Sequence, residues 1–342
     1  MQTQSTNIPS GLTGAIQRVL VVDDSRAQLK MVETMVRRWG YEVMTADSGH
    51  QALEIIRRTP PDLILSDWMM PGMTGFKRFK IGNFDVVTLM AGHEKNDAPH
   101  DTFGRNISDE AFAAASDAAR IPAHWAQTFF TPTLVNTGEA LVLFDTGPKP
   151  AGTVRALETA GYFVEDIDVV VLTHMHIDHI GGLHGPNSVT FPNARYVCGS
   201  MEFDAWDDTG SDVFDRTILP LKPEIEFVAE GDTVVPGITA IEAFGHTLGH
   251  MMFMVESTGE HLLLAADFAC HHVWSLAYPD WEMRLDEDKE QAAKTRRAVL
   301  EMLASDKIPF IGYHMPWPSV GYVDRLKDGR FHYVPESYQL LG

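Results

Sequence analysis

The chain has 342 residues, enough for one large domain and a smaller unit on the usual scale of about 150 residues per domain. Its 47 acidic side chains outnumber its 27 basic ones, giving a formal net charge of −20, and no basic cluster offsets the repulsion this creates towards nucleic acid. The apolar content of 44% is typical of a packed soluble protein, and no run approaches the ~20 apolar residues that cross a bilayer. We therefore expect neither a nucleic-acid partner nor a membrane span.

The compartment is predicted from the start of the chain and from its cysteines. The first seventeen residues, MQTQSTNIPSGLTGAIQ, lack the basic start and the apolar stretch of a secretory signal. The chain has only two cysteines, Cys198 and Cys270, which cannot build a disulfide framework. Both features predict a cytoplasmic protein.

The first 76 residues predict a partial parallel sheet. Apolar runs that read as buried strands alternate with segments that have apolar residues at helical spacing. The expected strands are 18–25, 41–46 and 62–67, and the expected helices are 26–39 and 48–58. Right-handed crossovers in this βαβαβ pattern would gather Asp23, Asp24 and Asp67 at one edge of the sheet.

This segment resembles the receiver domain of two-component response regulators, through VVDDS at 21–25 and SDWMMPGMTG at 66–75. The resemblance implies that Asp23 and Asp24 bind Mg²⁺, that Asp67 is the phosphoacceptor, and that a histidine kinase is a partner in a phosphorelay. It covers only the first half of the flavodoxin-like fold, because the later Ser or Thr, the later Lys before a Pro and the last two strands have no counterpart. We therefore interpret residues 1–76 as a truncated receiver with a structural or docking role.

A second and larger unit, 78–342, is expected after a junction in the segment GFKRFKIGN, with strand alternation restarting at Phe84. Short apolar strands punctuated by Gly and Pro follow, with helical patterns between and after them. The expected strands are 84–90, 131–137, 140–147, 168–174, 194–199, 238–244, 251–257 and 261–267, and the expected helices are 152–161 and 286–305. This order predicts two packed sheets covered outside by helices.

The segment LTHMHIDHIGG at 172–182 carries four metal-ligand side chains within six residues: His174, His176, Asp178 and His179. In an extended turn the first two point to one side, while the last two can face a neighbouring position, so two adjacent metals can share the loop. Imidazole and carboxylate ligands suit Zn²⁺, Fe²⁺ or Mn²⁺. The absence of cysteines at ligand spacing argues against a closed structural zinc site. The segment therefore predicts a metal centre with an open position.

The HxHxDH segment resembles the metallo-β-lactamase superfamily, and FDTG at 144–147, GHTLGH at 245–250, AAD at 265–267 and GYH at 312–314 follow in the expected order. The resemblance implies an αββα sandwich that holds two Zn²⁺, with iron or manganese as alternatives. It implies His174, His176 and His246 for the first metal, Asp178, His179 and His314 for the second, and Asp267 as the bridge. A metal-bridging hydroxide would then attack the substrate, with Asp178 as the catalytic residue that orients it.

Several further residues are expected around this centre. Asp145 would orient an imidazole without binding metal, and His250 would have a similar supporting role. His271 and His272, which closely follow Asp267 in the chain, could line the pocket, but no catalytic role is assigned to them.

The carboxyl-terminal stretch YHMPWPSVGYV looks most like the methyl-parathion-hydrolase-like branch of the superfamily. That branch suggests neutral, partly aromatic esters, lactones or phosphotriesters. Acyl-homoserine lactonases usually place a Tyr shortly after the bridging Asp, whereas this chain has DFACHH at 267–272. Trp274, Phe268, Met315 and Trp317 could form an apolar pocket wall, with ordinary core packing as the alternative.

The leading hypothesis is a dinuclear hydrolase acting on an ester-like small molecule. One alternative is a signalling hydrolase gated through phosphorylation of Asp67, and another is a metal-binding platform without catalysis. Phosphoryl uptake with Mg²⁺ would distinguish the first alternative, and the complete ligand set argues against the second.

Overall fold

The computed structural model describes residues 16–23, 26–66, 75–185, 188–207 and 209–336. It contains two compact units, Met1–Thr74 and Gly75–Gly342. None of the helices within the described ranges is both long enough and apolar enough to cross a membrane.

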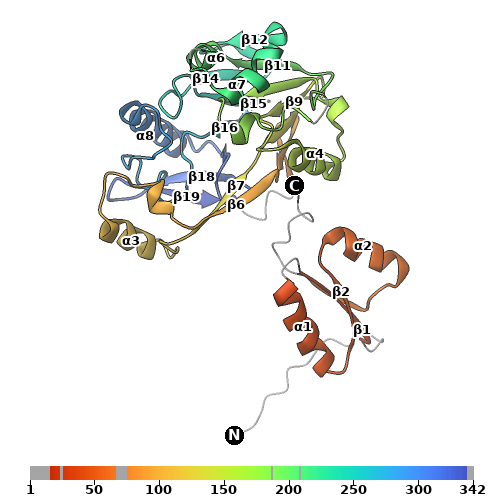
Figure 1. Cartoon of the computed structure of the whole chain (residues 1–342). Coiled ribbons are helices and arrows are strands. Elements are labelled where there is room, and N and C mark those ends of the chain that lie inside the picture. Colours follow the sequence, from red (N-terminus) through yellow and green to blue (C-terminus); the bar gives the residue numbers. More distant parts are fainter. Residues whose placement is uncertain (1–15, 24–25, 67–74, 186–187, 208, 337–342) are drawn as a thin grey trace. The chain divides into compact units, whose positions relative to one another are not determined.

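The first unit contains the parallel three-stranded sheet expected of half a receiver (Figure 1). Its strand order is β2-β1-β3. The bounds are β1 Arg18–Val22, α1 Arg26–Arg38, β2 Glu42–Ala46, α2 Gly49–Arg58 and β3 Leu63–Ser66. Alternate residues of β1 point to opposite faces, so Val19 and Val21 pack with Val36 of α1, while Leu20 and Val22 pack with Ala52 of α2.

Strand β3 forms one edge of this sheet among the described residues, since only β1 pairs with it. Leu63 and Ile64 on β3 are 39% and 46% exposed. This is the consequence expected of a receiver that lacks its last two strands, because those strands would continue the sheet beyond β3.

The second unit is a sandwich of two seven-stranded sheets. The first sheet has the order β12-β11-β10-β9-β8-β5-β4 and the bounds β4 Phe76–Ile81, β5 Phe84–Leu89, β8 Thr133–Asn136, β9 Leu141–Phe144, β10 Val169–Leu172, β11 Arg195–Gly199 and β12 Ile225–Val228. The second runs from β13 to β19 in chain order, with the bounds β13 Thr233–Val235, β14 Ile238–Glu242, β15 Met251–Ser257, β16 Glu260–Ala266, β17 Phe310–Gly312, β18 Val320–Arg325 and β19 Phe331–Pro335.

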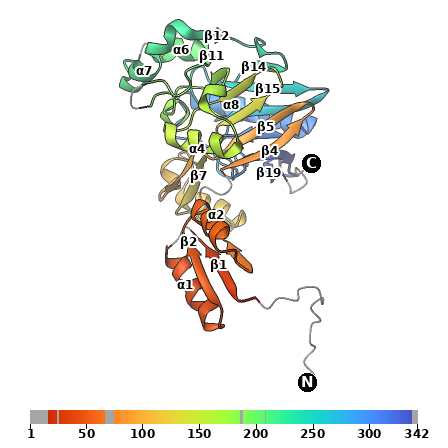
Figure 2. The same ribbon diagram turned by 90° about the vertical axis from the view of Figure 1, so that its right-hand side faces the viewer.

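Helices cover both outer faces, so the predicted αββα architecture is confirmed (Figures 1 and 2). The first sheet packs on α4, α6 and α7 through Leu157, Phe203 and Phe214, and the second packs on α8 through Leu300. The remaining bounds are β6 Gly92–Asn96, β7 Ala126–Phe130, α3 Asp109–Ala118, α4 Pro150–Ala160, α5 Ile177–Ile180, α6 Ser200–Asp207, α7 Asp212–Thr217, α8 Lys289–Asp306, η1 Pro99–Asp101, η2 Val164–Asp166 and η3 Leu219–Glu224.

Strand β10 shows why the strands read as continuous apolar runs. Val169 and Val171 face the core between the two sheets, while Val170 and Leu172 face the helix layer. Because both faces of the strand are buried, every position is apolar and no alternation is visible in the sequence.

The segment GFKRFKIGN, in which the junction was predicted, begins at Gly75, where the second compact unit begins. The rest of the segment forms β4, the first strand of that unit, and the turn to β5. Strand β4 pairs with β5 in antiparallel register, from Phe76 opposite Leu89 to Ile81 opposite Phe84. Phe79 and Ile81 face the core between the sheets, whereas the exposed residues Arg78 and Lys80 alternate with them. Basic residues such as these are common on edge strands, where they discourage pairing with another chain.

Candidate metal centre

The HxHxDH segment begins where the buried strand β10 ends. His174 is two residues beyond Leu172, the last residue of the strand. His176 is the N-cap of the short helix α5, and Asp178 and His179 lie within that helix. The sheet core fixes β10, and the helix then turns two further side chains into the same region.

The other predicted ligands reach this region from the second sheet. His246 lies in the loop between β14 and β15, Asp267 directly follows β16, and His314 follows β17. Strands β16 and β17 are parallel, so Asp267 and His314 lie beyond the same edge of the sheet.

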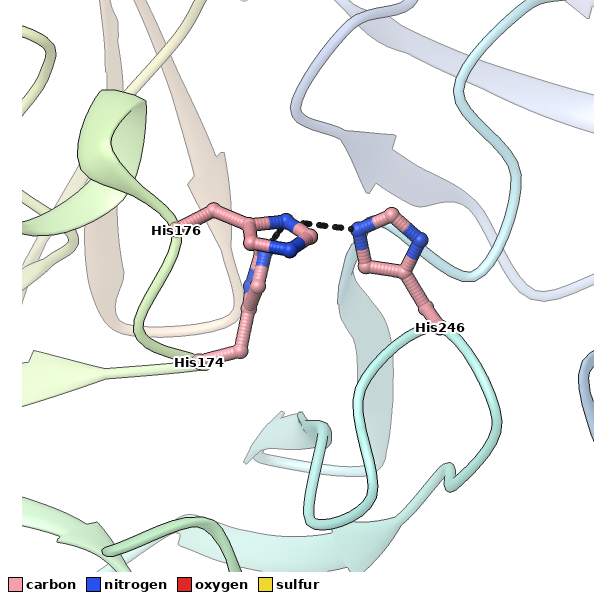
Figure 3. A group of neighbouring side chains, drawn as sticks. All are labelled: His174, His176 and His246. Carbon is pink, nitrogen blue, oxygen red and sulfur yellow. Dashed lines mark hydrogen bonds between the residues drawn. The ribbon is translucent and has the colours of Figure 1, made fainter. Parts of the chain in front are cut away.

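The seven predicted ligands converge into overlapping groups, each with one ligand atom per residue within 4.8 Å of the others. Figure 3 shows His174 and His176 from one loop facing His246 from another. The Nδ1 atom of His176 lies 3.0 Å from Nε2 of His174 and 3.1 Å from Nε2 of His246. Asp178, His179 and His314 form a neighbouring group.

Asp267 lies between these two groups. Its Oδ2 atom is 3.4 Å from Nε2 of His246 and 3.1 Å from Nε2 of His314. Its Oδ1 atom is 3.5 Å from Nε2 of His179. One carboxylate therefore reaches histidines of both groups, as a bridging ligand would.

The outer nitrogens of four histidines are held by oxygen atoms behind the centre. Nδ1 of His174 lies 3.1 Å from the Thr173 hydroxyl, and Nδ1 of His179 lies 2.8 Å from Asp145 Oδ2. The other two contacts join Nδ1 of His246 to Asp286 Oδ1 at 3.1 Å and Nδ1 of His314 to the Phe129 carbonyl at 2.8 Å. Each contact orients an imidazole and directs Nε2 inward, which is how metal-binding histidines are commonly supported.

Asp145 has the orienting position that was expected of it. Besides its contact with His179, its carboxylate accepts hydrogen bonds from the backbone N–H and the hydroxyl of Thr173, each at 2.9 Å. Because the Thr173 hydroxyl donates to Asp145, its oxygen is free to accept the Nδ1 proton of His174. Asp145 thus supports His179 directly and His174 through Thr173.

The donor set fits divalent metal ions. His174 and His246 donate through Nδ1, so their Nε2 lone pairs face the Asp267 carboxylate, an arrangement that is repulsive unless a cation lies between them. Nε2 of His179 and Oδ1 of Asp267 are buried and have no hydrogen-bond partner. Buried polar atoms without partners are rare, and a metal ion would satisfy both.

Burial and neighbouring charges set the protonation of the centre. Burial holds the pKa of His174 well below its usual value and, together with His246, lowers the pKa of His176 to about 4. Burial opposes ionisation of His314, but Asp267 and Asp178 raise its pKa to about 10. Burial likewise opposes ionisation of Asp178, yet His179 and His314 lower its pKa to about 2. Asp178 is therefore ionised at neutral pH.

His250 supports the centre from the side of Asp267, in line with its expected role. Its Nε2 accepts a hydrogen bond from the Asp267 backbone N–H at 3.1 Å, and its Nδ1 donates to the Ala243 carbonyl at 3.1 Å. Acceptance at Nε2 requires the neutral ring, and burial lowers the pKa of His250 to about 3.

Sequence reasoning missed Glu202, a buried carboxylate that ties two ligand loops together. It accepts hydrogen bonds from the backbone N–H of Met175 at 2.9 Å, the Thr247 hydroxyl at 2.6 Å and the backbone N–H of Gly249 at 3.0 Å. A Cβ atom at Gly249 would lie 2.0 Å from the Glu202 backbone nitrogen. No local pattern identifies Glu202, because it lies in α6, far along the chain from both loops.

Cys270 is a second residue that the sequence did not single out. Its Sγ atom lies 3.4 Å from Asp267 Oδ2, and Asp267, His246 and Cys270 form a further group of ligand-type atoms. Burial and the nearby Asp267 carboxylate raise the pKa of the thiol well above its usual value. The protonated thiol therefore donates to Asp267 here.

A cavity of about 920 Å³ opens onto the centre. The predicted ligands His176, Asp178, Asp267 and His314 line it. Its other walls include β6, the two residues Pro148 and Lys149 that precede α4, and the segment Met283–Leu285. The candidate metal centre is therefore accessible to a small molecule.

A smaller and mostly apolar cavity of about 200 Å³ also borders His314. Trp125, Trp274, His271 and His272 line it, so the expectation that the two histidines could face a pocket agrees with their position. Burial lowers the pKa of His272 to about 4 and holds that of His271 well below its usual value. Both histidines are neutral walls of this cavity at physiological pH.

The proposed apolar wall is only partly correct. Trp274 lines the smaller cavity, and its indole N–H donates to the Ser116 hydroxyl at 2.9 Å. Phe268 and Met315 instead belong to the core beneath α8. Trp317 is not among the residues lining either of these two cavities.

The receiver site is described only in part. Asp23 is buried directly after β1, and its backbone N–H donates to the Ala46 carbonyl at 3.1 Å. Asp24 and Asp67 lie outside the described residues. Their predicted roles in Mg²⁺ binding and phosphorylation stay predictions, as does gating of the enzyme through Asp67.

Comparison with protein families gives two matches. The model of the metallo-beta-lactamase superfamily matches residues 131–307, more than half of the chain. The model of the response regulator receiver domain matches residues 19–96. The end of the receiver match, 76–96, contains β4 to β6 of the second unit, so the described receiver sheet comprises the first three strands only.

Curated relatives of this chain include proteins that match it over a short segment only. Response regulator PleD of Caulobacter vibrioides is 49% identical over 59 residues, which is 17% of this chain and 13% of PleD. Protein PilH of Pseudomonas aeruginosa is 35% identical over 60 residues, which is 18% of this chain and 50% of PilH. The chain thus spans no more than half of these two relatives.

Solved structures match the larger unit. One is AidC, described as a dizinc quorum-quenching lactonase in complex with a product, N-hexanoyl-L-homoserine. AidC is 26% identical to this chain, the match covers 78% of this chain and 99% of AidC, and the TM-score is 0.72. AbOPH, described as a hydrolase in the beta lactamase superfamily, is 22% identical with the same coverage and a TM-score of 0.73. A probable metal-dependent hydrolase from Staphylococcus aureus is 20% identical, with 75% and 99% covered and a TM-score of 0.63.

Proposed function

The chain belongs to the metallo-beta-lactamase superfamily as a metal-dependent hydrolase, and we propose that it uses two metals to cleave an ester, lactone or phosphotriester of a small molecule. One observation carries this proposal. Four of the proposed ligands, His176, Asp178, Asp267 and His314, line a cavity large enough for a small organic substrate. The reacting bond can therefore reach the metals directly.

The proposed ligands are His174, His176 and His246 for the first metal, Asp178, His179 and His314 for the second, and Asp267 as the bridge. Zn²⁺ is the proposed metal because imidazole and carboxylate donors suit it, and Fe²⁺ or Mn²⁺ fits the same donors. When bound, two such ions supply an activated water as nucleophile and a Lewis acid for the electrophile.

Asp178 is the proposed catalytic residue of the chain itself. Its side chain lines the large cavity, is 23% exposed and is ionised at neutral pH, so its carboxylate can accept a hydrogen bond from an attacking water and orient it. The Tyr313 hydroxyl donates to the Asp178 carbonyl at 2.6 Å and thereby fixes the backbone of this residue.

The smaller cavity supports a substrate with an uncharged apolar group. Its lining is mostly apolar, and its two histidines are neutral, so an ionic group placed there would lose hydration without gaining a partner of opposite charge. The likeness to AidC supports lactones among the candidates, although the Tyr expected of acyl-homoserine lactonases shortly after Asp267 is absent from DFACHH.

The test is hydrolysis by purified, zinc-loaded protein of a panel of aryl esters, lactones, phosphotriesters, thioesters and a β-lactam. Asp178→Ala serves as the blank, because it removes both a ligand and the group that orients water. Selective turnover that is lost in this variant would support the proposal and name the substrate class. Activity equal to the blank throughout the panel, on protein shown to hold two metals, would contradict it.

A further inference from the structure

Behind His246 lies a buried ion pair that neither the motifs nor the expected ligand set includes. Asp286 Oδ2 accepts a hydrogen bond from Nη2 of Arg296 at 2.7 Å, and both side chains are 2% exposed. The other carboxylate oxygen, Oδ1, lies 3.1 Å from Nδ1 of His246. One carboxylate thus joins an arginine of α8 to a proposed metal ligand.

The backbone around this pair is tied to the His246 loop. The N–H of Glu287 donates to the His246 carbonyl at 3.1 Å, and the N–H of Asp288 donates to the Gly245 carbonyl at 3.0 Å. Gly245 has φ +124°, and a Cβ atom there would lie 2.2 Å from the Ala292 backbone nitrogen. This close approach, open only to glycine, holds the start of α8 against the loop.

Arg296 also contacts the chain next to the proposed bridging residue. Its Nε atom donates to the carbonyl of Phe268 at 3.3 Å, and Phe268 is the residue that follows Asp267. The pair therefore connects the loop that carries His246 with the segment that carries Asp267.

Packing alone does not explain such a pair. Removing two charges from water is costly, and apolar residues of similar size often stabilise a fold as well or better. What the pair adds is a fixed acceptor for the Nδ1 proton of His246. With that proton held, the Nε2 lone pair faces His176 Nδ1 and Asp267 Oδ2.

We propose that Asp286, held in place by Arg296, is a positioning residue that fixes the tautomer and ring orientation of His246 for the first metal. This inference rests on the proposed metal centre. Loss of a carboxylate that supports a metal-binding histidine typically lowers metal affinity by about 10- to 100-fold. We expect a loss of this size for the first metal.

The experiment measures Co²⁺ and Zn²⁺ binding to the full chain by titration and dialysis, together with the visible spectrum of the Co²⁺ protein. The main variant is D286L/R296M, which removes both buried charges together and leaves neither unpaired. A second variant, D286N, keeps the shape and an acceptor oxygen but loses the charge, so it reports on the same contact if the double variant does not fold. Circular dichroism checks folding.

The chain offers a matched control. Asp280 and Arg297 form another ion pair between the same loop and the same helix, but their side chains are 67% and 44% exposed. D280L/R297M therefore changes the same residue types without touching His246.

We expect D286L/R296M to lose affinity for the first metal by about 10- to 100-fold with an altered Co²⁺ spectrum, D286N to lose less, and the control to match the unsubstituted protein. Unchanged affinity and spectrum in folded D286L/R296M, or in D286N if the double variant does not fold, would overturn the proposed role of Asp286. The proposed function of the metal centre would stand in that case. If the unsubstituted protein itself binds no metal, the proposed function falls and this inference with it.

Discussion

Replacing Glu202 by alanine is expected to loosen both loops that carry the histidines of the first metal. The change removes the acceptor for the buried N–H groups of Met175 and Gly249 and for the Thr247 hydroxyl. The hydroxyl can rotate about its own bond, but the two N–H groups are fixed by the backbone. A buried donor left without a partner costs about 1–3 kcal/mol, so the two together cost about 2–6 kcal/mol.

Part of this loss is offset, because burial raises the pKa of Glu202 and its removal relieves the cost of burying a carboxyl group. We therefore expect the lower half of the range, which is still a large fraction of a typical stability of about 5–15 kcal/mol. Glu202→Gln keeps one oxygen acceptor and the shape of the side chain, so its loss should be smaller.

The assay is urea unfolding of the metal-free chain, followed by measurement of the metal stoichiometry. Glu287→Gln is the control, because Glu287 is exposed and accepts a hydrogen bond from Leu248 in the same loop at 3.2 Å. The control should shift the unfolding free energy by no more than about 0.5 kcal/mol. If Glu202→Ala has the unfolding midpoint and metal content of the unsubstituted protein, the three hydrogen bonds do not hold the loops.

Three further predictions concern other parts of the second unit. Since burial lowers the pKa of His250 to about 3, the folded state binds fewer protons than the unfolded state below the ordinary value of 6.5. The unfolding free energy should therefore fall by up to about 1.4 kcal/mol per unit as pH drops through this window, and His250→Gln should flatten the slope in urea titrations. Despite burial, Asp267 and Asp178 raise the pKa of His314 to about 10, so zinc must displace its proton at pH 7. Apparent zinc affinity should rise with pH, and calorimetry in buffers of different ionisation enthalpy should detect the released proton; heats independent of the buffer would contradict this. Finally, Gly152→Ala places a Cβ atom 1.8 Å from the Ala91 carbonyl oxygen and should destabilise the protein by about 1–3 kcal/mol, measured by thermal unfolding. Gly92→Ala, whose Cβ atom would meet a Phe130 carbon at an ordinary 3.6 Å, is its control, and equal effects would refute the steric explanation.

Much of the architecture could be read from the sequence because its signals are local. Strand β10 is a continuous apolar run because both of its faces are buried, and the HxHxDH segment follows it within a few residues. Strand β4 was missed for a related reason. Arg78 and Lys80 alternate with core residues, and only its pairing with β5 distinguishes an edge strand from a junction between units.

The sequence by itself determined which residue types are available for the centre, since each predicted ligand lies in a short motif beside a strand end. The tertiary structure alone decided which groups hold those ligands. Asp286 lies 40 positions along the chain from its partner His246, and Glu202 lies 45 positions from its partner Thr247. Cys270 is only three residues from Asp267, but no sequence pattern around it shows whether its thiol faces the metal centre or the hydrophobic core. The physical reason is that hydrogen bonds to buried carboxylates depend on how the loops pack in space. Sequence periodicity indicates which side chains are buried, but not which groups they hydrogen-bond.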